Sequence, residues 1–461
     1  MRIILNAPVT IETLALIIGA KIKTDSSLGL IQCITTDTRE CELGDLFFDL
    51  ASTKDLSRRN VLEAISLGAV AVSAITDLPC LYTPDVSLAL LRLAAYYKST
   101  LRELKHTVAI TGSVGKTTTK NFLSTLLKYK YGVHSTIGNF NNFIGLSLSV
   151  LSAPCDTEAL VLELGMNREG EISEMSRAIN PTLALITNIG TSHIGRLGDR
   201  AAIARAKAEI TDGNPKGYTL YPAGEELLGS VERGLTFSLD FPGADFHTEN
   251  KACPSGENLT VYRTRDGCEL VFPKSLVGRH LYLDLLIAVS ACELCDMSGE
   301  ELGVALGNIN MSQQRSRRIS ISDLTVIDDC YNASLESVRA MLDTLRDYPS
   351  PRSMLLGDIL ELGDSAYSIH RSLGLYAASL ELDRLYAFGK YALFTAEGAL
   401  QGGMSESAIF VNLDLERPDI TAEQIIEEHE SGEVVLFKAS RKTGLERVIA
   451  LLKKWEEENV L

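Results

Sequence analysis

The sequence lacks an excess of positive charge. Its 461 residues include 44 Lys and Arg against 60 Asp and Glu, which gives a formal net charge of −16. An acidic protein is repelled by the phosphate backbone of nucleic acids and by anionic membranes, so non-specific binding to either is excluded. A local basic pocket for a phosphorylated small molecule remains compatible with this charge.

Long apolar runs and a secretory leader are also missing. The chain has no run of about 18 apolar residues, the length that a transmembrane helix requires. The first ten residues contain Arg2 and Pro8 but neither a long apolar stretch nor a small-residue cleavage site. We therefore expect a cytoplasmic protein with no stable membrane insertion.

Cysteines are few and irregularly placed. Nine are scattered through the chain, and this odd number with loose spacing does not fit a disulfide framework. Cys292 and Cys295 form a C-x-x-C pair at an apolar run, with no second pair nearby. We interpret this pair as helix packing rather than as a metal or redox site.

The remaining composition is typical of a globular α/β protein. Hydrophobic residues make up 45% and charged residues 23%, which argues against a disordered chain. Apolar runs at 107–111, 159–164 and 183–187 are separated by helical segments. Near-continuous apolar strands that alternate with helices indicate a parallel sheet covered on both faces.

The length suggests about three domains. We place them at 1–85, 86–310 and 311–461, each with α/β character and with a β-rich insertion in the second from about 212 to 277. Further strands and helices are predicted at 46–48, 61–67, 69–72, 281–306, 324–327, 353–356, 424–428, 434–437 and 445–454. Thr10 is a plausible cap for a helix that starts beside it.

The strongest local motif, A-I-T-G-S-V-G-K-T-T-T, spans residues 109–119. A strand runs into a glycine-rich turn and then into a helix that begins near Lys116. Gly112 and Gly115 let backbone N–H groups approach phosphate oxygens, and the helix N-terminus adds partial positive charge. Lys116 is expected to reach the terminal phosphates of a nucleotide, and Thr117 to bind Mg²⁺. Only two residues separate the glycines, so this is a shortened phosphate loop.

Three further segments lie where a parallel sheet would place them beside this loop. Glu163 ends one strand, and its carboxylate suits either Mg²⁺ or a structural ion pair. His193 follows the next strand and is a candidate metal ligand, although a lone His is more often an ordinary surface or core residue. Lys207 lies in a segment that, taken alone, is an unremarkable amphipathic helix with a solvated lysine.

Other polar turns are less specific. Asn141 and Asn142 precede an apolar helix, where their amides either bind a polar substrate or cap the helix. Asp329 ends a strand of the last third, and carboxylates at that point can bind ribose hydroxyls. The segments 357–363 and 438–441 follow later strands. Polar groups after successive strands are typical of a binding cleft, although every α/β protein has polar loops there.

Taken together, these segments resemble the Mur ligases, the ATP-dependent amide-forming enzymes of peptidoglycan precursor synthesis. The loop T-G-S-x-G-K-T-T at 111–118 is typical of the whole family. The motifs that match its D-Ala-D-Ala-adding members are N-N-x-I-G at 141–145, E-L-G-M-N at 163–167, N-I-G-x-S-H at 188–193, A-x-A-K-x-E-I at 204–210, D-D-C-Y-N-A-S at 328–334, L-G-D-I-L-E-L-G at 356–363 with His370, and K-A-S-R at 438–441. In the first unit, T-D-T-R at 36–39 and G-D-L-F-F at 44–48 match the opening motif, so the resemblance covers nearly the full length.

The resemblance implies an N-terminal domain for a UDP-sugar, a central ATPase domain and a C-terminal Rossmann-like domain. It implies Lys116, Lys207 and His193 as catalytic residues. The implied ATP contacts are Gly112, Ser113, Val114, Gly115, Lys116, Thr117, Thr118, His280, Asp284, Arg317 and Asp329. The implied Mg²⁺ ligands are Thr117, Glu163, His193 and Lys207, and the implied substrate contacts are Asp37, Thr38, Arg39, Asn141, Asn142 and Asn332.

Lys207 matches the lysine that is carbamylated in this family. A neutral amine that adds CO₂ becomes an anionic carbamate, which can hold a second Mg²⁺ where a cationic lysine would repel it. The implied reaction joins D-Ala-D-Ala to UDP-MurNAc-tripeptide. The tripeptide carboxylate attacks the γ-phosphate of ATP, and the amine of D-Ala-D-Ala then attacks the acyl phosphate. The implied partners are these small molecules, and we expect a monomer.

The sequence departs from the family pattern at three places. The family's D-G-H-x-F motif is replaced by D-L-S-R-R at 55–59, and Asp284 stands where an adenine-contacting Asn is usual. The segment Q-R-S-R-R at 314–318 contains three arginines that could contact ATP, and we assign this contact to Arg317. These departures are compatible with a paralogue that has a changed amino-acid or sugar-nucleotide substrate, and they leave open whether the tripeptide carries lysine or diaminopimelate.

Three other functions stay open at this stage. A family member that adds a diamino acid or glutamate is disfavoured, because the D-N-P-R motif of the diaminopimelate-adding enzymes is absent. A non-ligating ATP-binding homologue would not need the complete set of Lys116, Thr117, Glu163, His193 and Lys207. A simple kinase or GTPase does not explain the E-L-G-M-N and A-K-x-E segments.

Overall fold

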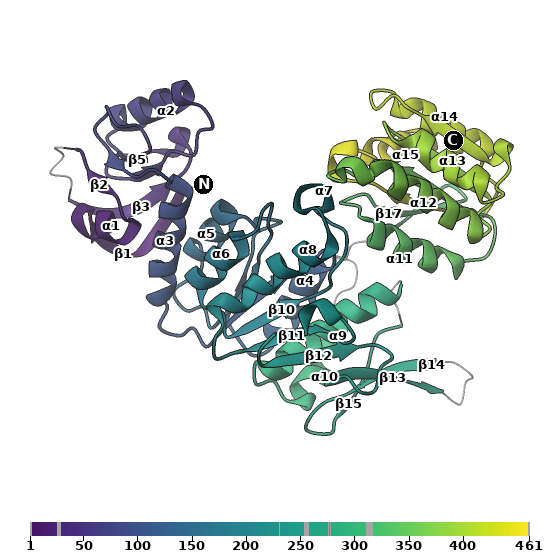
Figure 1. Cartoon of the computed structure of the whole chain (residues 1–461), viewed down its shortest axis with the longest axis horizontal. Coiled ribbons are helices and arrows are strands. Elements are labelled where there is room, and N and C mark those ends of the chain that lie inside the picture. The colour runs from purple at the N-terminus through teal and green to yellow at the C-terminus, as the bar shows by residue number, and fades with distance from the viewer. Residues whose placement is uncertain are drawn as a thin grey trace.

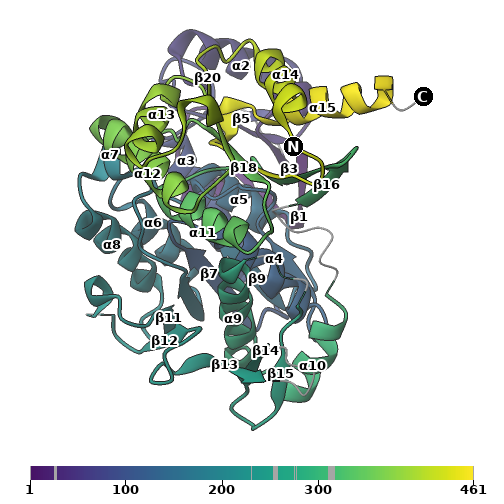
Figure 2. The same cartoon turned by 90° about the vertical axis from the view of Figure 1, so that its right-hand side faces the viewer.

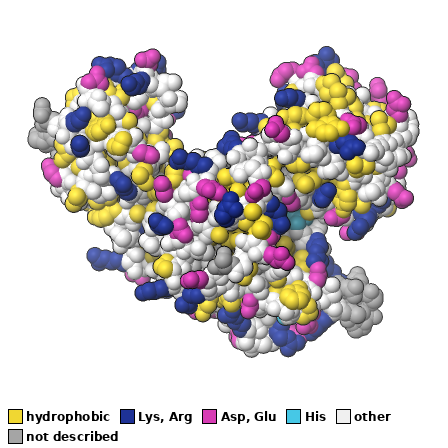
Figure 3. Space-filling model, in the orientation of Figure 1, with side chains coloured by type: hydrophobic (Ala, Val, Ile, Leu, Met, Phe, Trp, Pro, Cys, Tyr) yellow, Lys and Arg dark blue, Asp and Glu magenta, His cyan; other side chains and the backbone are white. Residues whose placement is uncertain are grey.

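The structure, a computed structural model, describes residues 2–24, 29–229, 231–252, 258–274, 276, 278–309 and 317–459. It is built around three β-sheets of six, nine and six strands, in chain order. Each sheet forms the centre of one lobe, and the N-terminal and C-terminal lobes stand apart on the central lobe (Figure 1). A broad notch separates these two outer lobes on the molecular surface (Figure 3).

The N-terminal sheet has the strand order β1-β3-β4-β5-β6-β2, and its four inner strands are parallel. Its elements are β1 (Arg2–Thr10), α1 (Ile11–Ile18), β2 (Lys21–Ile22), β3 (Leu30–Thr35), β4 (Leu46–Phe48), α2 (Lys54–Ser66), β5 (Val70–Ser73) and β6 (Leu81–Tyr82). Thr10 caps α1, because its Oγ1 accepts a hydrogen bond from the Thr13 amide at 3.2 Å. The helix predicted at 61–67 begins earlier, at Lys54, because Thr53 caps it.

The central sheet has the order β15-β14-β13-β12-β11-β10-β7-β9-β8. Its strands are β7 (His106–Thr111), β8 (Val133–Ser135), β9 (Ala159–Glu163), β10 (Leu183–Ile186), β11 (Tyr218–Pro222), β12 (Gly234–Ser238), β13 (Phe246–Ala252), β14 (Asn258–Arg263) and β15 (Glu269–Val271). The strands from β8 to β13 are parallel, and β14 and β15 are antiparallel. The β-rich stretch at 212–277 therefore continues the same sheet.

Helices cover both faces of this sheet, as its apolar strands predicted. They are α3 (Val86–Ser99), α4 (Lys116–Leu127), α5 (Phe143–Leu151), α6 (Glu171–Ile179), α7 (Ile194–Leu197), α8 (Arg200–Ala208), α9 (Arg279–Leu294) and α10 (Gly299–Gly307). Successive residues of β7 alternate between two cores: Ala109 packs with α3 and α5, whereas Val108 and Ile110 pack with α4 and α9. Figure 2 shows α4 and α9 beside the central strands β7 and β9. Cys292 and Cys295 are buried in the second core as free thiols.

The C-terminal sheet has the order β16-β17-β21-β18-β19-β20, with only β16 antiparallel to its neighbour. Its strands are β16 (Arg317–Ile321), β17 (Leu324–Asp329), β18 (Arg352–Gly357), β19 (Arg384–Phe388), β20 (Ile409–Asn412) and β21 (Val434–Lys438). Its helices are α11 (Leu335–Arg346), α12 (Ala366–Ser379), α13 (Ala392–Gln401), α14 (Pro418–Glu428) and α15 (Glu446–Asn459). Among the described residues, no helix is both long and apolar enough to cross a bilayer.

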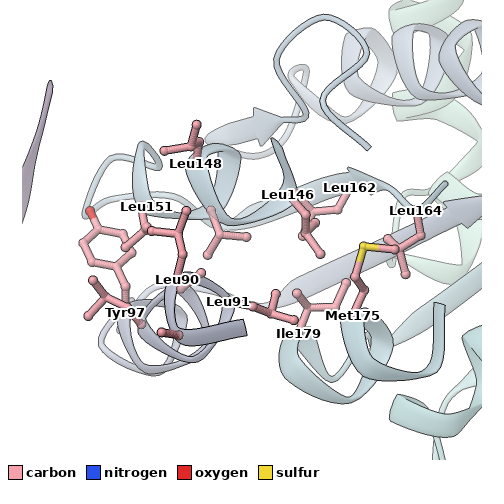
Figure 4. Close-up of a cluster of buried hydrophobic side chains, with 14 of the residues drawn as sticks. Leu90, Leu91, Tyr97, Leu146, Leu148, Leu151, Leu162, Leu164, Met175 and Ile179 are labelled. Atoms are coloured by element: carbon pink, nitrogen blue, oxygen red, sulfur yellow. The ribbon is translucent and has the colours of Figure 1, made fainter. Parts of the chain in front are cut away.

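The N-terminal and central lobes share one hydrophobic core. Leu14 of α1 lies in the same buried cluster as Leu90 of α3 and Leu146 of α5, the last two of which are drawn in Figure 4. Tyr97 lies near the C-terminal end of α3, and its hydroxyl donates a hydrogen bond to the Ala153 carbonyl of the central lobe at 2.7 Å. Helix α3 therefore joins the two lobes by packing. The domain limits at 85/86 and 310/311 stay predictions.

This shared core predicts that truncating a buried leucine of α3 lowers the free energy of unfolding more than truncating an exposed leucine of α2. Leu90→Ala removes a fully buried side chain and should lower the free energy of unfolding by about 2–5 kcal/mol. Leu62→Ala, at an exposed position of α2, should change it by less than about 0.5 kcal/mol. Urea unfolding followed by circular dichroism measures both, and equal effects would contradict the shared core.

Candidate active site

The phosphate loop lies between the end of β7 and the start of α4, as the sequence predicted. Gly115 precedes the helix with φ of 83°, in the left-handed region that favours glycine. A side chain at Gly112 would lie 1.8 Å from Thr187 Oγ1, and one at Gly115 would lie 2.4 Å from Asp284 Oδ1. Both glycines are therefore needed because neighbouring segments approach the loop so closely.

The residues after β10 hold the loop in shape. The backbone amides of Ser113 and Val114 both donate to Asn188 Oδ1, each at 3.0 Å. Lys116 Nζ donates to the Gly112 carbonyl at 2.6 Å, so its ammonium lies over the turn where phosphates are expected. Asn188 was not among the predicted site residues, although its motif was recognised.

Two cavities open beside this loop, between the central and C-terminal lobes. The larger has a volume of about 500 Å³, and Lys116, His193 and Lys207 line it together with residues of the C-terminal lobe. The smaller has a volume of about 220 Å³. Of the predicted residues, it is lined by Ser113, Val114, Gly115, Lys116, Thr117, Thr118, Asn141, Glu163, His280, Asp284, Asp329 and Asn332.

The smaller cavity holds most of the residues predicted to contact ATP. His280 is neutral there, because burial lowers its pKa to about 4. Asp284 accepts a hydrogen bond from Thr119 Oγ1 at 3.3 Å. Asp329 is paired with Lys438, whose ammonium also donates to the Asn332 carbonyl at 3.1 Å. The end of β17 and the end of β21 thus meet across the cavity from the phosphate loop.

Glu163 lies at the end of β9 with its side chain fully buried. Its Oε2 accepts a hydrogen bond from Thr117 Oγ1 at 3.1 Å, so two predicted Mg²⁺ ligands are in contact. Its Oε1 has no hydrogen-bond partner and lies 3.3 Å from Lys120 Nζ. A buried carboxylate beside a threonine hydroxyl supplies oxygen ligands of the kind that Mg²⁺ prefers.

Lys207 is buried on α8, contrary to the solvated lysine that its helix suggests in isolation. Burial, with the nearby charge of Lys116, lowers the pKa of Lys207 well below its usual value. No acceptor among the described residues hydrogen-bonds its amine. A lowered pKa favours the neutral form of the amine, and this fits the chemistry of carbamate formation because only the neutral form adds CO₂.

His193 is the N-cap of α7, a short helix of the central lobe that stands beside the C-terminal lobe (Figure 1). Its Nδ1 is 3.1 Å from Glu361 Oε2, although the ring N–H is not aligned for a hydrogen bond. Burial lowers its pKa to about 4, against the opposing effect of Glu361. A neutral imidazole can ligate a metal, so His193 also fits its predicted role.

The C-terminal lobe contributes two carboxylates that were not among the predicted site residues, although the recognised motif at 356–363 contains Glu361. Glu336 Oε1 accepts a hydrogen bond from the Thr191 amide at 2.6 Å, and a side chain at Gly190 would meet the Glu336 carboxylate. Glu361 lies beside both His193 and Arg196. No single-sequence signal pairs residues so far apart along the chain, which is why both were missed.

Some predicted residues lie elsewhere. Asp37, Thr38 and Arg39 are in the N-terminal lobe and line neither cavity, and Asp37 forms an ion pair with Arg39 at 2.5 Å. Arg317 begins β16, but its side chain and all of Arg315 lie outside the described residues. Arg318 is described and lies over the Tyr348 ring, away from the nucleotide cavity.

Family models match most of the chain. The Mur ligase middle domain matches residues 110–292, and the Mur ligase, glutamate ligase domain matches residues 314–453. The chain is 34% identical over 434 residues to the UDP-N-acetylmuramoyl-tripeptide--D-alanyl-D-alanine ligase of Bacillus subtilis, covering 91% of this chain and 93% of the relative. The enzyme of the same name from Escherichia coli is 29% identical, with 92% and 94% covered.

Solved structures agree with these matches. MurF from Acinetobacter baumannii superposes with a TM-score of 0.85 at 29% identity, covering 97% of this chain and 99% of that one. MurF from Thermotoga maritima in complex with ADP gives 0.79 at 25% identity, with 92% and 98% covered. The fold, the phosphate loop and these matches together show that the chain belongs to the Mur ligase family.

Proposed function

We propose that the chain is an ATP-dependent ligase that joins D-Ala-D-Ala to the tripeptide carboxylate of UDP-MurNAc-tripeptide. The observation that carries this proposal is the buried Lys207, which has no hydrogen-bond acceptor among the described residues and shares one interdomain cavity with Lys116 of the phosphate loop. A nucleotide-binding protein without ligation chemistry has no need of such a group. The names of the relatives and their coverage of this chain support the substrate assignment.

The smaller cavity is the proposed ATP site. We assign the phosphates to the loop amides and to Lys116, and the nucleoside to the region of His280, Asp284 and Asp329. Because His280 is neutral, it can both donate and accept hydrogen bonds toward a base. The carboxylate of Asp284 only accepts hydrogen bonds, whereas the amide of the usual Asn both donates and accepts them.

Thr117 and Glu163 are the proposed ligands of Mg²⁺, with His193 and modified Lys207 for a second ion. Bound Mg²⁺ would offset negative charge on the phosphoryl group in transfer. The protein's own contribution is to position ATP and the carboxylate and to exclude water from the cavity. No nucleophilic side chain is required, because the substrate carboxylate attacks directly.

The proposed chemistry has two steps. The tripeptide carboxylate attacks the γ-phosphorus of ATP, which forms an acyl phosphate and releases ADP. The amine of D-Ala-D-Ala then attacks the acyl carbon, so that an amide forms and phosphate leaves with loss of a proton from the amine. Lys116 is placed to stabilise charge on the transferring phosphoryl group.

Lys207 is the proposed carbamate. Its neutral amine attacks the carbon of CO₂, an N–C bond forms, and one N–H proton is lost to solvent. The product carries a negative charge in a position where unmodified lysine is buried beside the cation Lys116. That exchange replaces a desolvated amine by an anionic metal ligand beside the cation of Lys116.

The N-terminal lobe is the proposed site of the UDP-sugar, with Asp37, Thr38 and Arg39 as contacts. The proposed contacts of the peptide substrates are Asn141, Asn142 and Asn332, which line the larger cavity.

We place the enzyme in the cytoplasm as a monomer, with lobes divided at 1–85, 86–310 and 311–461.

Ligation can be tested directly. The protein is mixed with ATP, Mg²⁺, bicarbonate, UDP-MurNAc-tripeptide and D-Ala-D-Ala. We expect a product heavier by D-Ala-D-Ala less one water, with one phosphate released for each bond formed, as measured by mass spectrometry and a phosphate assay.

Lys116→Met provides the matched control for this assay, since it should lower kcat by roughly 10²–10³-fold while the fold is kept. ATP binding without any product would show that the donor or acceptor differs from the one proposed. Product formation at an unchanged rate in Lys116→Met would contradict the assigned phosphate site.

The carbamate predicts a chemical rescue. Lys207→Ala should abolish ligation, because the anionic ligand is lost, and short-chain carboxylic acids added to the assay should restore part of the activity. Lys207→Arg, which keeps a cation and cannot be carbamylated, should be inactive and should not be rescued. Full activity in Lys207→Ala would rule out a catalytic role for this residue.

A further inference from the structure

Lys120 is a buried cation that the proposed chemistry does not use. It lies on α4, one helical turn after Thr117, and only 4% of it is exposed. Its ammonium donates to the carbonyls of Thr136 and Gly138, each at 3.0 Å, and lies 3.3 Å from Glu163 Oε1. Three oxygens therefore surround this ammonium.

The two carboxylate oxygens of Glu163 face different groups. Oε2 faces the Thr117 hydroxyl at 3.1 Å, on the side of the nucleotide cavity, whereas Oε1 faces Lys120. The carboxylate is fully buried, so little water screens its attraction to the ammonium. Lys120 thus offsets the charge of this proposed metal ligand before any ion arrives.

The other carboxylates that line the nucleotide cavity are engaged elsewhere: Asp284 accepts from Thr119 Oγ1, Asp329 is paired with Lys438, and Glu336 accepts from the Thr191 amide. Within the described part of the chain, no group of three or more His, Cys, Asp and Glu side chains is arranged to hold a metal ion. Lys116 and Lys207 line the adjoining cavity, and the first of these adds positive charge. At Glu163, a divalent cation would meet a carboxylate that already lies beside an ammonium.

We propose that Lys120 is a positioning residue that makes metal binding at Glu163 depend on bound nucleotide. It orients Glu163 through Oε1 and offsets its charge, so the site binds a free divalent cation poorly. The phosphates of ATP supply the negative charge and the additional oxygen ligands that the protein withholds. This inference rests on the proposed function, since it takes Glu163 as a metal ligand.

The same contacts connect the metal site to the substrate side. Lys120 holds the carbonyls of the turn at 136–138, and Thr136 Oγ1 accepts a hydrogen bond from the Glu163 amide at 2.8 Å. That turn leads into Asn141 and Asn142, which line the larger cavity. Lys120 therefore ties the metal carboxylate to the loop that is proposed to contact the peptide substrate.

The test measures Mn²⁺ affinity by electron paramagnetic resonance, with and without ADP. In the wild type we expect weak Mn²⁺ binding without nucleotide and much tighter binding with ADP. Lys120→Gln and Lys120→Met remove the charge and should tighten nucleotide-free Mn²⁺ binding by roughly tenfold or more. Lys120→Arg keeps the charge and should behave as the wild type.

Lys128→Met is the matched control, because Lys128 follows the same helix at an exposed position. It should leave Mn²⁺ affinity unchanged in both conditions. Thermal unfolding identifies any variant that has lost its fold, and Lys120→Gln, which keeps hydrogen-bond donors, provides a second folded variant if Lys120→Met unfolds.

The outcomes separate this inference from the function on which it rests. If Glu163→Gln does not weaken Mn²⁺ binding in the presence of ADP, then Glu163 is not a metal ligand and the proposed function loses its metal site. If Glu163→Gln does weaken it, but folded Lys120 variants without the charge bind free Mn²⁺ no more tightly than the wild type, the role of Lys120 is overturned. Tighter nucleotide-free binding in those variants, absent in Lys128→Met, supports it.

Discussion

The position of β7 between β9 and β10 is the constraint on which the site depends. In this parallel register, Ile110 lies opposite Glu163, and Thr111 lies opposite Ile186. The three strands therefore end at one edge of the sheet, and the segments that follow them meet there. The phosphate loop approaches the turn after β10 so closely that no side chain can replace the hydrogen at Gly112. A shift of one register position would separate the loop from Glu163.

Around this edge, an acidic protein concentrates lysine side chains. The whole chain has a formal charge of −16, yet Lys120 lies 3.3 Å from Glu163 Oε1, and Lys116 and Lys207 line the larger cavity. Each lysine is in a different state: Lys116 contacts loop carbonyls, Lys120 is paired, and Lys207 has its pKa lowered by burial. This local excess of positive groups suits anionic substrates such as nucleotide phosphates, which the overall charge would repel.

The C-terminal lobe completes the site rather than merely covering it. Glu336 binds the turn at 190–191, and Glu361 lies against His193 and Arg196, so two carboxylates from one lobe contact the same short segment of the other. Both cavities are lined from both lobes. The shared core of α3 joins the N-terminal lobe to the central one. Packing contacts therefore connect all three lobes.

Local sequence patterns determined much of this protein. Apolar runs located β7, β9 and β10, the glycine-rich turn identified the phosphate loop, and motif order indicated the family. Tertiary structure alone decided which groups are buried and paired. The helix pattern around Lys207 predicts a solvated side chain, whereas the fold buries it. Lys120 meets Glu163 only because α4 packs against β9. Burial and long-range pairing depend on contacts between distant segments, and periodicity within one segment carries no information about them.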